Sequence, residues 1–165
     1  MEKTNSPSHV PGRLWESVFR PLLHSYWRFA RGMTLGVRAL VVNSAGRILL
    51  VQHSYVRGWH LPGGGVERGE TMLQALAREL AEEGNVRLGS APRLHGIFFN
   101  RYVSKRDHIA VYVVQDFEQD GPFKANREIT VASFFALDAL PNDTTAATRA
   151  RIAEVMGGAP VSEHW

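Results

Sequence analysis

Apolar residues gather in short continuous runs in some stretches of the chain and recur every three to four residues in others. Two runs, at residues 33–43 and 47–53, are separated by the turn residues Asn-Ser-Ala-Gly, so they predict two strands joined by a short turn. Further apolar runs of strand length occur at residues 94–102, 108–117 and 129–135. These runs predict at least one sheet.

The clearest helical pattern covers residues 71–83. Thr71 is suited to the N-cap, and Gln74 three residues later completes a capping box. Asn85 is suited to the left-handed residue that ends a helix. Four apolar residues form one stripe along this helix, namely Leu73, Leu76, Ala77 and Leu80.

Residues 138–140 and 144–156 also show a helical pattern, and Asn142 or Asp143 is available as the cap of the second of them. Strands therefore flank helices along the chain. This order predicts helices packed on both faces of a mixed sheet.

The two ends of the chain differ from this central region. Residues 1–12 are polar, contain two prolines and lack the apolar core of a secretory signal, so we expect a disordered tail. Residues 13–32 carry aromatic residues and leucines at helical spacing and predict an amphipathic helical segment. Such a helix suits packing on the domain body, with a membrane surface or a protein partner as the alternative. One globular domain is expected over residues 33–157, and an irregular tail over residues 158–165.

Composition narrows the function classes. The chain has 165 residues, enough for one domain, and contains no cysteine, which excludes a disulfide framework and a thiolate nucleophile or metal ligand. Its 19 basic and 16 acidic residues give a net charge of +3, which is weak support for binding nucleic acid. No stretch approaches the roughly 20 apolar residues of a membrane span. We expect a cytoplasmic protein.

Three glutamates in the helix over residues 71–83 are the first sign of chemistry. Glu79, Glu82 and Glu83 have i, i+3 and i+4 spacing, so they share one helix face and repel one another by about a few tenths of a kcal/mol per pair. Glu82 and Glu83 also lie in the last turn, where the helix dipole disfavours anions. A charged, solvated helix face is the alternative explanation. A divalent cation would remove both penalties, and oxygen ligands alone suit Mg²⁺, with Mn²⁺ as an alternative.

A glycine-rich loop precedes this helix. Gly63, Gly64 and Gly65 allow backbone groups to approach an ion or a phosphate closely. No Gly-Lys-Ser/Thr follows, so the loop is not a Walker A motif. Because protein-bound Mg²⁺ usually shares its remaining positions with substrate phosphates, the combination indicates a phosphorylated substrate.

The segment from Gly64 to Val86 resembles the Nudix box, Gly-x5-Glu-x7-Arg-Glu-U-x-Glu-Glu-x-Gly-U, in which U is a bulky apolar residue. The box departs at one position, because Asn85 stands where the pattern has its second glycine. Asparagine is the next-best residue for a left-handed helix end, so we expect the shape to be kept. The residues that match are Gly64, Glu70, Arg78, Glu79, Leu80, Glu82, Glu83 and Val86.

This resemblance implies the Nudix fold, an α/β/α sandwich with a mixed β-sheet between helices, and places the Nudix hydrolase domain at residues 33–157. It also implies a pyrophosphohydrolase that cleaves a nucleoside diphosphate linked to another moiety, with Mg²⁺ as cofactor and a nucleotide-derived small molecule as substrate. A homodimer is left open. The alternative function is a non-catalytic Nudix-fold module that binds nucleotides or RNA, and a role on RNA or on a membrane surface is a minor alternative.

The resemblance also implies residue roles. Glu82 and Glu83 would ligate the metal, and Glu79 would be a ligand or the general base. Gly63 would offer its carbonyl to the ion. Arg78 would orient the glutamates through a salt bridge, above all with Glu70. Gly64 and Glu70 are the structural residues of the box.

Residues outside the box complete the expected site. Glu128 stands just before a predicted strand, where several Nudix proteins supply an additional ligand or base, and an exposed loop acid is the equal alternative. Trp59 and Tyr102 are aromatic residues on which a base could stack, although a core position is the more common fate of such residues. Arg57 could meet a phosphate. No subfamily marker selects the substrate.

Overall fold

The fold is described from a computed structural model that covers residues 32–165. The expected tail over residues 1–12 and the expected helical segment over residues 13–32 lie outside the described residues, except for Gly32. Within the described part, no helix is long and apolar enough to cross a membrane.

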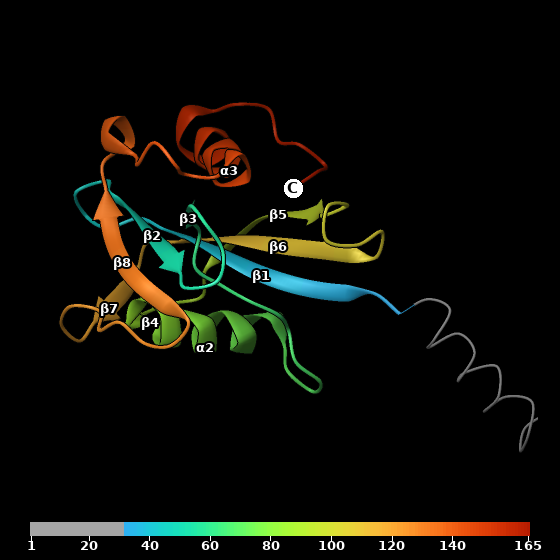
Figure 1. Cartoon of the computed structure of the whole chain (residues 1–165), viewed down its shortest axis with the longest axis horizontal. Helices are drawn as coiled ribbons and strands as arrows, with labels where there is room; N and C mark the ends of the chain where they lie inside the picture. The colour runs from blue at the N-terminus through green and yellow to red at the C-terminus, as the bar shows by residue number, and fades with distance from the viewer. Residues whose placement is uncertain (1–31) are drawn as a thin grey trace, which may run out of the picture. The chain divides into compact units, whose positions relative to one another are not determined.

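Three small sheets form the centre of the domain (Figure 1). In the first, β1 pairs with β6 in parallel and β5 pairs with β6 in antiparallel orientation, so the sheet is mixed. The second sheet has the order β3-β2-β8 and is antiparallel, and the third pairs β4 with β7. The strands are β1 (Thr34–Val41), β2 (Ile48–His53), β3 (Trp59–His60), β4 (Val86–Leu88), β5 (Arg93–Phe99), β6 (Asp107–Val114), β7 (Phe117–Gln119) and β8 (Ile129–Phe135).

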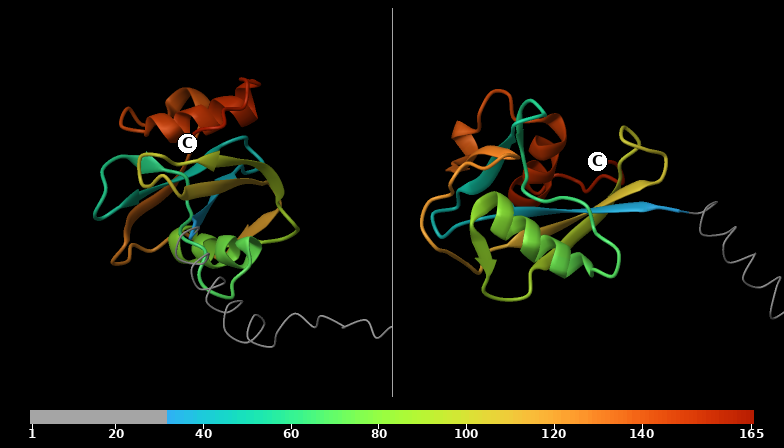
Figure 2. Two further views of the ribbon diagram at one scale, coloured as in Figure 1. Left: turned by 90° about the vertical axis from the view of Figure 1, so that its right-hand side faces the viewer. Right: turned by 60° about the horizontal axis from the view of Figure 1, so that its bottom comes forward.

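Two helices cover opposite faces of the strands, as Figure 2 shows. They are α2 (Met72–Gly84) and α3 (Ala146–Gly157), and a short 3-10 helix, η2 (Leu137–Ala139), precedes α3. The expected sandwich of a mixed β structure between helices is confirmed.

Alternation along β1 explains the two layers. Val37 and Ala39 belong to the core cluster beneath α2, whereas Leu40 belongs to the cluster beneath α3. Successive side chains of a strand point to opposite faces, so one apolar strand supplies both cores. Of the predicted apolar stripe on α2, Leu76 and Leu80 join the first cluster, together with Ala75. The other two predicted members, Leu73 and Ala77, are exposed, because the buried face of α2 is turned toward Ala75.

The first two strands differ from the simplest expectation for two strands joined by a turn. The turn is present, because the Asn43 side chain accepts from the amides of Ala45 and Arg47 at 3.0 Å each. The strands then separate into different sheets, and only Val42 and Ile48 pair across the turn. The three shortest strands, β3, β4 and β7, were not predicted, because two or three residues are too few to show a period.

The predicted ends of α2 are confirmed. The Thr71 hydroxyl accepts from the Gln74 amide and the Gln74 side chain accepts from the Thr71 amide, which completes the capping box. Asn85 ends the helix in the left-handed conformation, with φ 53°. Its side chain also donates to the carbonyls of Asp120 and Gly121, at 2.8 and 3.2 Å.

The cap predicted for α3 was wrong. Thr145, rather than Asn142 or Asp143, caps the helix, and its hydroxyl accepts from the Thr148 amide at 3.3 Å. Backbone bonds explain the difference, since Trp59 bonds to the carbonyl of Asp143 and to the amide of Thr145. The chain is therefore held beside β3 until Thr145 and turns into the helix only afterwards.

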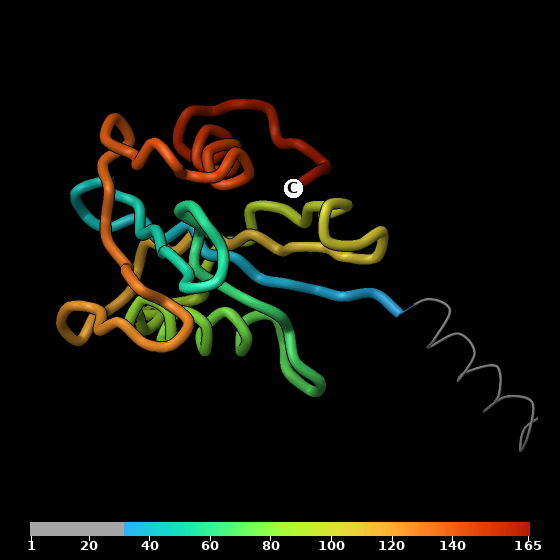
Figure 3. Tube along the Cα trace, viewed as in Figure 1, coloured from blue at the N-terminus to red at the C-terminus, as the bar shows by residue number. Residues whose placement is uncertain are grey.

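The last eight residues hold neither helix nor strand, yet they are bound to the domain. The amide of Trp165 donates to the carbonyl of Phe99 at 3.1 Å, and Arg151 of α3 donates to the carbonyl of His164 at 3.0 Å. Figure 3 shows this end of the trace returning beside β5. The segment is therefore held in place by bonds at its very end.

The left-handed residue of α2 generates a stability prediction. Asn85→Ala should destabilise the protein by about 1–2 kcal/mol, because alanine disfavours the left-handed region and loses the two side-chain bonds. Asn85→Gly keeps the backbone unstrained and should cost less. Urea denaturation of both variants against the unmodified protein measures the difference. Equal losses in the two variants would show that backbone strain is not the cause.

Candidate active site

The glycine loop lies along the open edge of β1. The amides of Val37 and Ala39 donate to the carbonyls of Gly64 and Pro62 at 2.9 Å each, and Val66 donates back to the carbonyl of Leu35 at 2.9 Å. β6 occupies the other edge of β1. The loop therefore behaves as an extra strand, and its position is set by main-chain bonds rather than by its own side chains.

Two of the three glycines lie in close contact with other parts of the site. At Gly63, φ is +137°, and a Cβ would stand 2.1 Å from the carbonyl oxygen of Val37. At Gly64, a Cβ would stand 2.2 Å from Oε1 of Glu79. At Gly65, a Cβ would meet no atom within 4 Å. The loop thus approaches the strand at one glycine and the acidic helix at the next.

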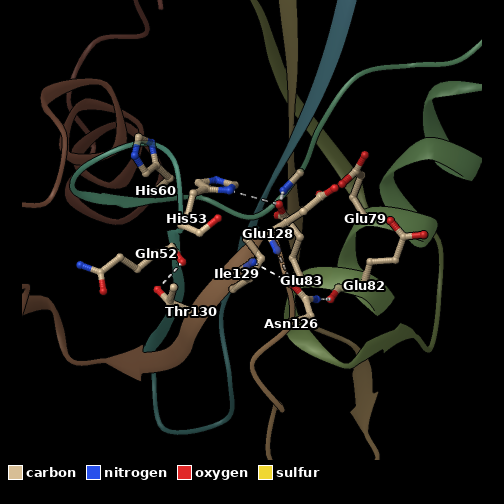
Figure 4. A network of polar contacts seen from close by, with 12 residues as sticks. Gln52, His53, His60, Glu79, Glu82, Glu83, Asn126, Glu128, Ile129 and Thr130 are labelled. Atoms are coloured by element: carbon tan, nitrogen blue, oxygen red, sulfur yellow. Dashed lines mark hydrogen bonds and ion pairs between the residues drawn. The ribbon is translucent and has the colours of Figure 1, made fainter.

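Glu79, Glu83 and Glu128 line one cavity of about 460 Å³ together with the glycine loop. Figure 4 shows Glu79 and Glu83 extending from α2, and Glu128 coming from the chain just before β8. The structure therefore brings the residue outside the box to the same place as the residues within it.

Glu83 is the most buried of these acids, with 5% of its surface exposed. Its Oε2 accepts from the amide of Gly63 at 2.7 Å. Burial raises the pKa of the Glu83 carboxyl to about 7, against the opposing effect of the Gly63 bond and of the Arg38 charge. In the absence of a cation this carboxyl is held where its charge is poorly solvated.

Arg78 links the acids into a network. It donates to Glu70 through Nε and Nη2 at 3.0 and 3.1 Å and to Glu79 at 2.7 Å, so the predicted pair with Glu70 is present. These bonds raise the pKa of Arg78, and the same contact with Arg78 lowers the pKa of Glu70. A further bond runs to the carbonyl of Gly65 at 3.1 Å. Arg78 therefore holds Glu79 beside the loop.

Glu82 is separated from the cavity. Its side chain is 60% exposed and lies 3.6 Å from Nη1 of Arg78, and the cavity lining does not include it. Glu82 is also the outermost of the labelled glutamates in Figure 4. Of the three glutamates predicted to share one function, the structure brings two directly into the cavity.

Two residues that sequence reasoning missed stand beside Glu83. His53 is buried, its Nδ1 has no hydrogen-bond partner, and that atom lies 3.8 Å from Oε1 of Glu83. Burial lowers the pKa of His53 to about 4, helped by the charges of Arg38 and His60, so the ring is neutral at pH 7. Arg38 donates to the carbonyls of Leu61 and Gly63. A lone charged or polar residue in an apolar run was the only sequence signal for either.

The three residues predicted to bind substrate do not lie together at one site. Trp59 packs edge to face on Phe135, with ring centroids 4.8 Å apart, against the core cluster beneath α3. Tyr102 is 80% exposed and lines a second cavity of about 860 Å³. Arg57 lines neither this second cavity nor the first.

The second cavity adjoins the first, because four residues line both: Arg38, Asn100, Val103 and Ile109. Its other walls include alanines of α3, the ion pair of Arg151 and Glu154, and residues of the C-terminal segment, among them Trp165. An acidic cavity lined by the glycine loop therefore adjoins a larger and more apolar one. That arrangement suits a ligand with one highly charged and one organic part.

Comparison of the sequence and of the structure with known proteins points to one family. The sequence model of the family described as "NUDIX domain" matches residues 32–155. Among solved structures, a MutT NUDIX hydrolase from Burkholderia pseudomallei superposes with a TM-score of 0.64 at 29% identity, over 74% of this chain and 98% of the other.

Curated relatives match over shorter stretches. An RNA pyrophosphohydrolase of Halorhodospira halophila is 45% identical over 60 residues, which are 36% of this chain and 32% of the relative. A diphosphoinositol polyphosphate phosphohydrolase 2 of Rattus norvegicus is 42% identical over 74 residues, which are 44% of this chain and 41% of the relative. The matched stretch thus spans less than half the length of each relative.

The three glycines provide a graded test of the loop. Gly64→Ala should leave folding nearly unchanged but displace the Glu79 carboxylate, and so weaken binding of Mn²⁺ in calorimetry. Gly63→Ala should lower the free energy of unfolding by about 3 kcal/mol or more, because it combines a positive φ with a backbone clash. Gly65→Ala is the control and should change stability by less than about 0.5 kcal/mol. Unchanged Mn²⁺ affinity in a folded Gly64→Ala protein would contradict the assigned contact.

The buried acid generates a pH prediction for the metal-free protein. Because the pKa of Glu83 rises from 4.5 to about 7 on folding, its favourable contribution is complete below pH 4.5 and is lost as the pH rises through 7. Glu83→Gln keeps an acceptor for the Gly63 amide and removes this loss. In the presence of EDTA the variant should therefore become more stable than the unmodified protein, by at most about 3 kcal/mol above pH 7.

Urea denaturation at pH 4.5, 6 and 8 measures the effect, and Glu67→Gln, an exposed acid outside the cavity, is the control. A difference between Glu83→Gln and the unmodified protein that does not vary with pH would contradict the burial of an ionised Glu83.

Proposed function

The chain belongs to the NUDIX family, and from this premise we propose that it hydrolyses a phosphoric anhydride bond in a nucleotide-derived substrate with the aid of Mg²⁺ or Mn²⁺. The observation that carries the proposal is that Glu79, Glu83 and Glu128 line one cavity opposite the glycine loop. Three carboxylates at one cavity are costly unless a cation joins them.

The donor set fits such an ion. Carboxylate and carbonyl oxygens are the ligands that Mg²⁺ and Mn²⁺ prefer. Oε2 of Glu83 is bonded to Gly63, whereas Oε1 has no hydrogen bond among the described residues and is available as a ligand. Glu79 and the Gly63 carbonyl are the further ligands of this proposal, and Glu82 would join them by turning away from Arg78.

Within residues 32–165, no three acidic or histidine side chains already converge tightly enough to enclose an ion. Mg²⁺ commonly keeps several waters and takes only one or two protein carboxylates directly. The proposal therefore includes water and substrate oxygens in the coordination. The bound ion would neutralise charge on the phosphates and lower the pKa of a coordinated water.

The protein residues supply orientation and proton transfer. Water attacks one phosphorus of the anhydride, the bond from that phosphorus to the bridging oxygen breaks, and the proton of the water passes to a carboxylate. Glu128 and Glu79 are the two candidates for that base. Arg78 holds Glu79 in place through its bond of 2.7 Å, and so acts through Glu79 rather than on the substrate.

The second cavity supports the division of the substrate into two parts. Its apolar walls and Tyr102 suit the organic group attached to the phosphates. The relatives act, by their names, on RNA and on a diphosphoinositol polyphosphate, so the family resemblance does not select this group. Arg57 and Trp59 are less suited to the role, because neither lines the cavity.

A substrate panel tests the function. With Mg²⁺ present, the protein should release phosphate or a nucleoside monophosphate from at least one of these compounds: nucleoside triphosphates, nucleotide sugars, dinucleoside polyphosphates and 5′-triphosphorylated RNA. Glu128→Gln should lower kcat on the best substrate by about 10²-fold or more if Glu128 is the base. Glu83→Gln should weaken Mn²⁺ binding in calorimetry, and Glu82→Gln should do so if it is a ligand.

Glu67→Gln again serves as the control, because it is an exposed acid near the loop. Absence of hydrolysis of every panel member, together with absence of metal binding, would overturn the proposal. Binding of a nucleotide or of RNA without any turnover would instead favour a non-catalytic module of the same fold.

A further inference from the structure

Arg38 stands at the junction of the two cavities. Of the four residues that line both, it alone is charged. It lies on β1 between Val37 and Ala39, whose side chains enter the core beneath α2, so its own side chain points to the other face. An arginine in that position interrupts an apolar strand. The cost of placing it there calls for a reason beyond packing.

The guanidinium lacks a counter-ion of its own. Among residues 32–165, no carboxylate forms an ion pair with Arg38, and both of its hydrogen bonds leave from Nη1, toward the carbonyls of Leu61 and Gly63. An arginine has five N–H donors, so the three on Nε and Nη2 are without a protein partner in the described structure. They are not sealed from solvent either. Burial lowers the pKa of Arg38, with Glu83 and Glu79 opposing the effect through their charges.

Two cationic groups can therefore bind the carbonyl oxygen of Gly63. Arg38 donates to it in the metal-free structure, and the proposed function assigns the same oxygen to a divalent cation. Two cations on one carbonyl oxygen repel each other strongly where the surroundings are poorly polarisable. The amide of Gly63 is bonded to Glu83, which keeps this glycine at the acidic end of the first cavity.

We infer that Arg38 and the divalent cation compete for the Gly63 carbonyl, and that metal binding releases Arg38 to bind an anionic group of the substrate where the two cavities meet. The inference rests on the proposed function. It adds a substrate requirement, namely a phosphate group between the reacting phosphorus and the organic part. It also implies an order of binding, in which the cation binds before the anion because the cation frees Arg38.

This inference predicts effects of opposite sign on two ligands. Without Arg38 the ion meets no competing charge, so metal alone should bind more tightly. The anion loses its partner, so it should bind more weakly. If Arg38 only braced the loop, its loss would loosen Gly63 and weaken both ligands together.

Calorimetry with Mn²⁺ alone, and then with methylenediphosphonate at saturating Mn²⁺, separates these outcomes. Arg38→Met retains most of the apolar stem and should bind Mn²⁺ at least fivefold more tightly, and the diphosphonate at least fivefold more weakly, than the unmodified protein. Arg47→Met, which removes an exposed arginine from the turn before β2, is the control and should leave both affinities unchanged. Equal or weaker Mn²⁺ binding by a folded Arg38→Met protein overturns the inference, and so does unchanged diphosphonate affinity.

A measurement on the unmodified protein covers the case in which Arg38→Met fails to fold. In ¹⁵N-labelled protein, Mg²⁺ alone should shift the side-chain Nε–H signal of Arg38, and adding the diphosphonate should shift it again. An Arg38 Nε–H signal that does not shift when Mg²⁺ is added overturns the inference.

Hydrolysis of the substrate panel by the unmodified protein is recorded in the same series. Turnover together with an unmoved Arg38 signal rejects the competition alone, whereas absence of both turnover and Mn²⁺ binding rejects the proposed function as well.

Discussion

The hydrogen bond between the Gly63 amide and the Glu83 carboxylate joins the three parts of the site, which are the glycine loop, β1 and α2. It ties a loop that belongs to the edge of β1 to a helix that covers one face of that strand. Through it, the carboxylate of a buried acid is placed beside the backbone of a loop whose three glycines carry no side chains of their own. The remaining features follow from this junction: the glycine at position 64 leaves room for Glu79, and Arg78 holds that carboxylate in the space provided.

Sequence reasoning reached those parts of the fold and site that depend on local spacing. The capping box at Thr71, the left-handed Asn85 and the pair between Arg78 and Glu70 are set by residues close in the chain, and all are present. Arg38 and His53 were missed, because each matters only through a contact with a loop or helix distant in the sequence. The cap of α3 was mispredicted for the same reason, since a bond to Trp59 decides where the helix begins.

The position of a glutamate on the helix could be predicted from the sequence, but its burial could not. The spacing of Glu79, Glu82 and Glu83 made them equivalent on a helical wheel. In the structure Glu83 is buried, Glu79 is bonded to Arg78, and the Glu82 side chain is mostly exposed. The loop, which covers only part of the helix face, creates this distinction. A helix face viewed alone cannot distinguish a buried carboxylate from an exposed one, because that depends on what packs against it.

The loop along β1 has a second consequence, for the behaviour of the chain in concentrated solution. An uncovered strand edge offers unpaired amides and carbonyls to other molecules and promotes edge-to-edge association. In this domain residues 62–66 occupy that edge of β1 with main-chain bonds. The segment that shapes the site therefore also shields an aggregation-prone surface, so damage to the loop threatens solubility as well as chemistry.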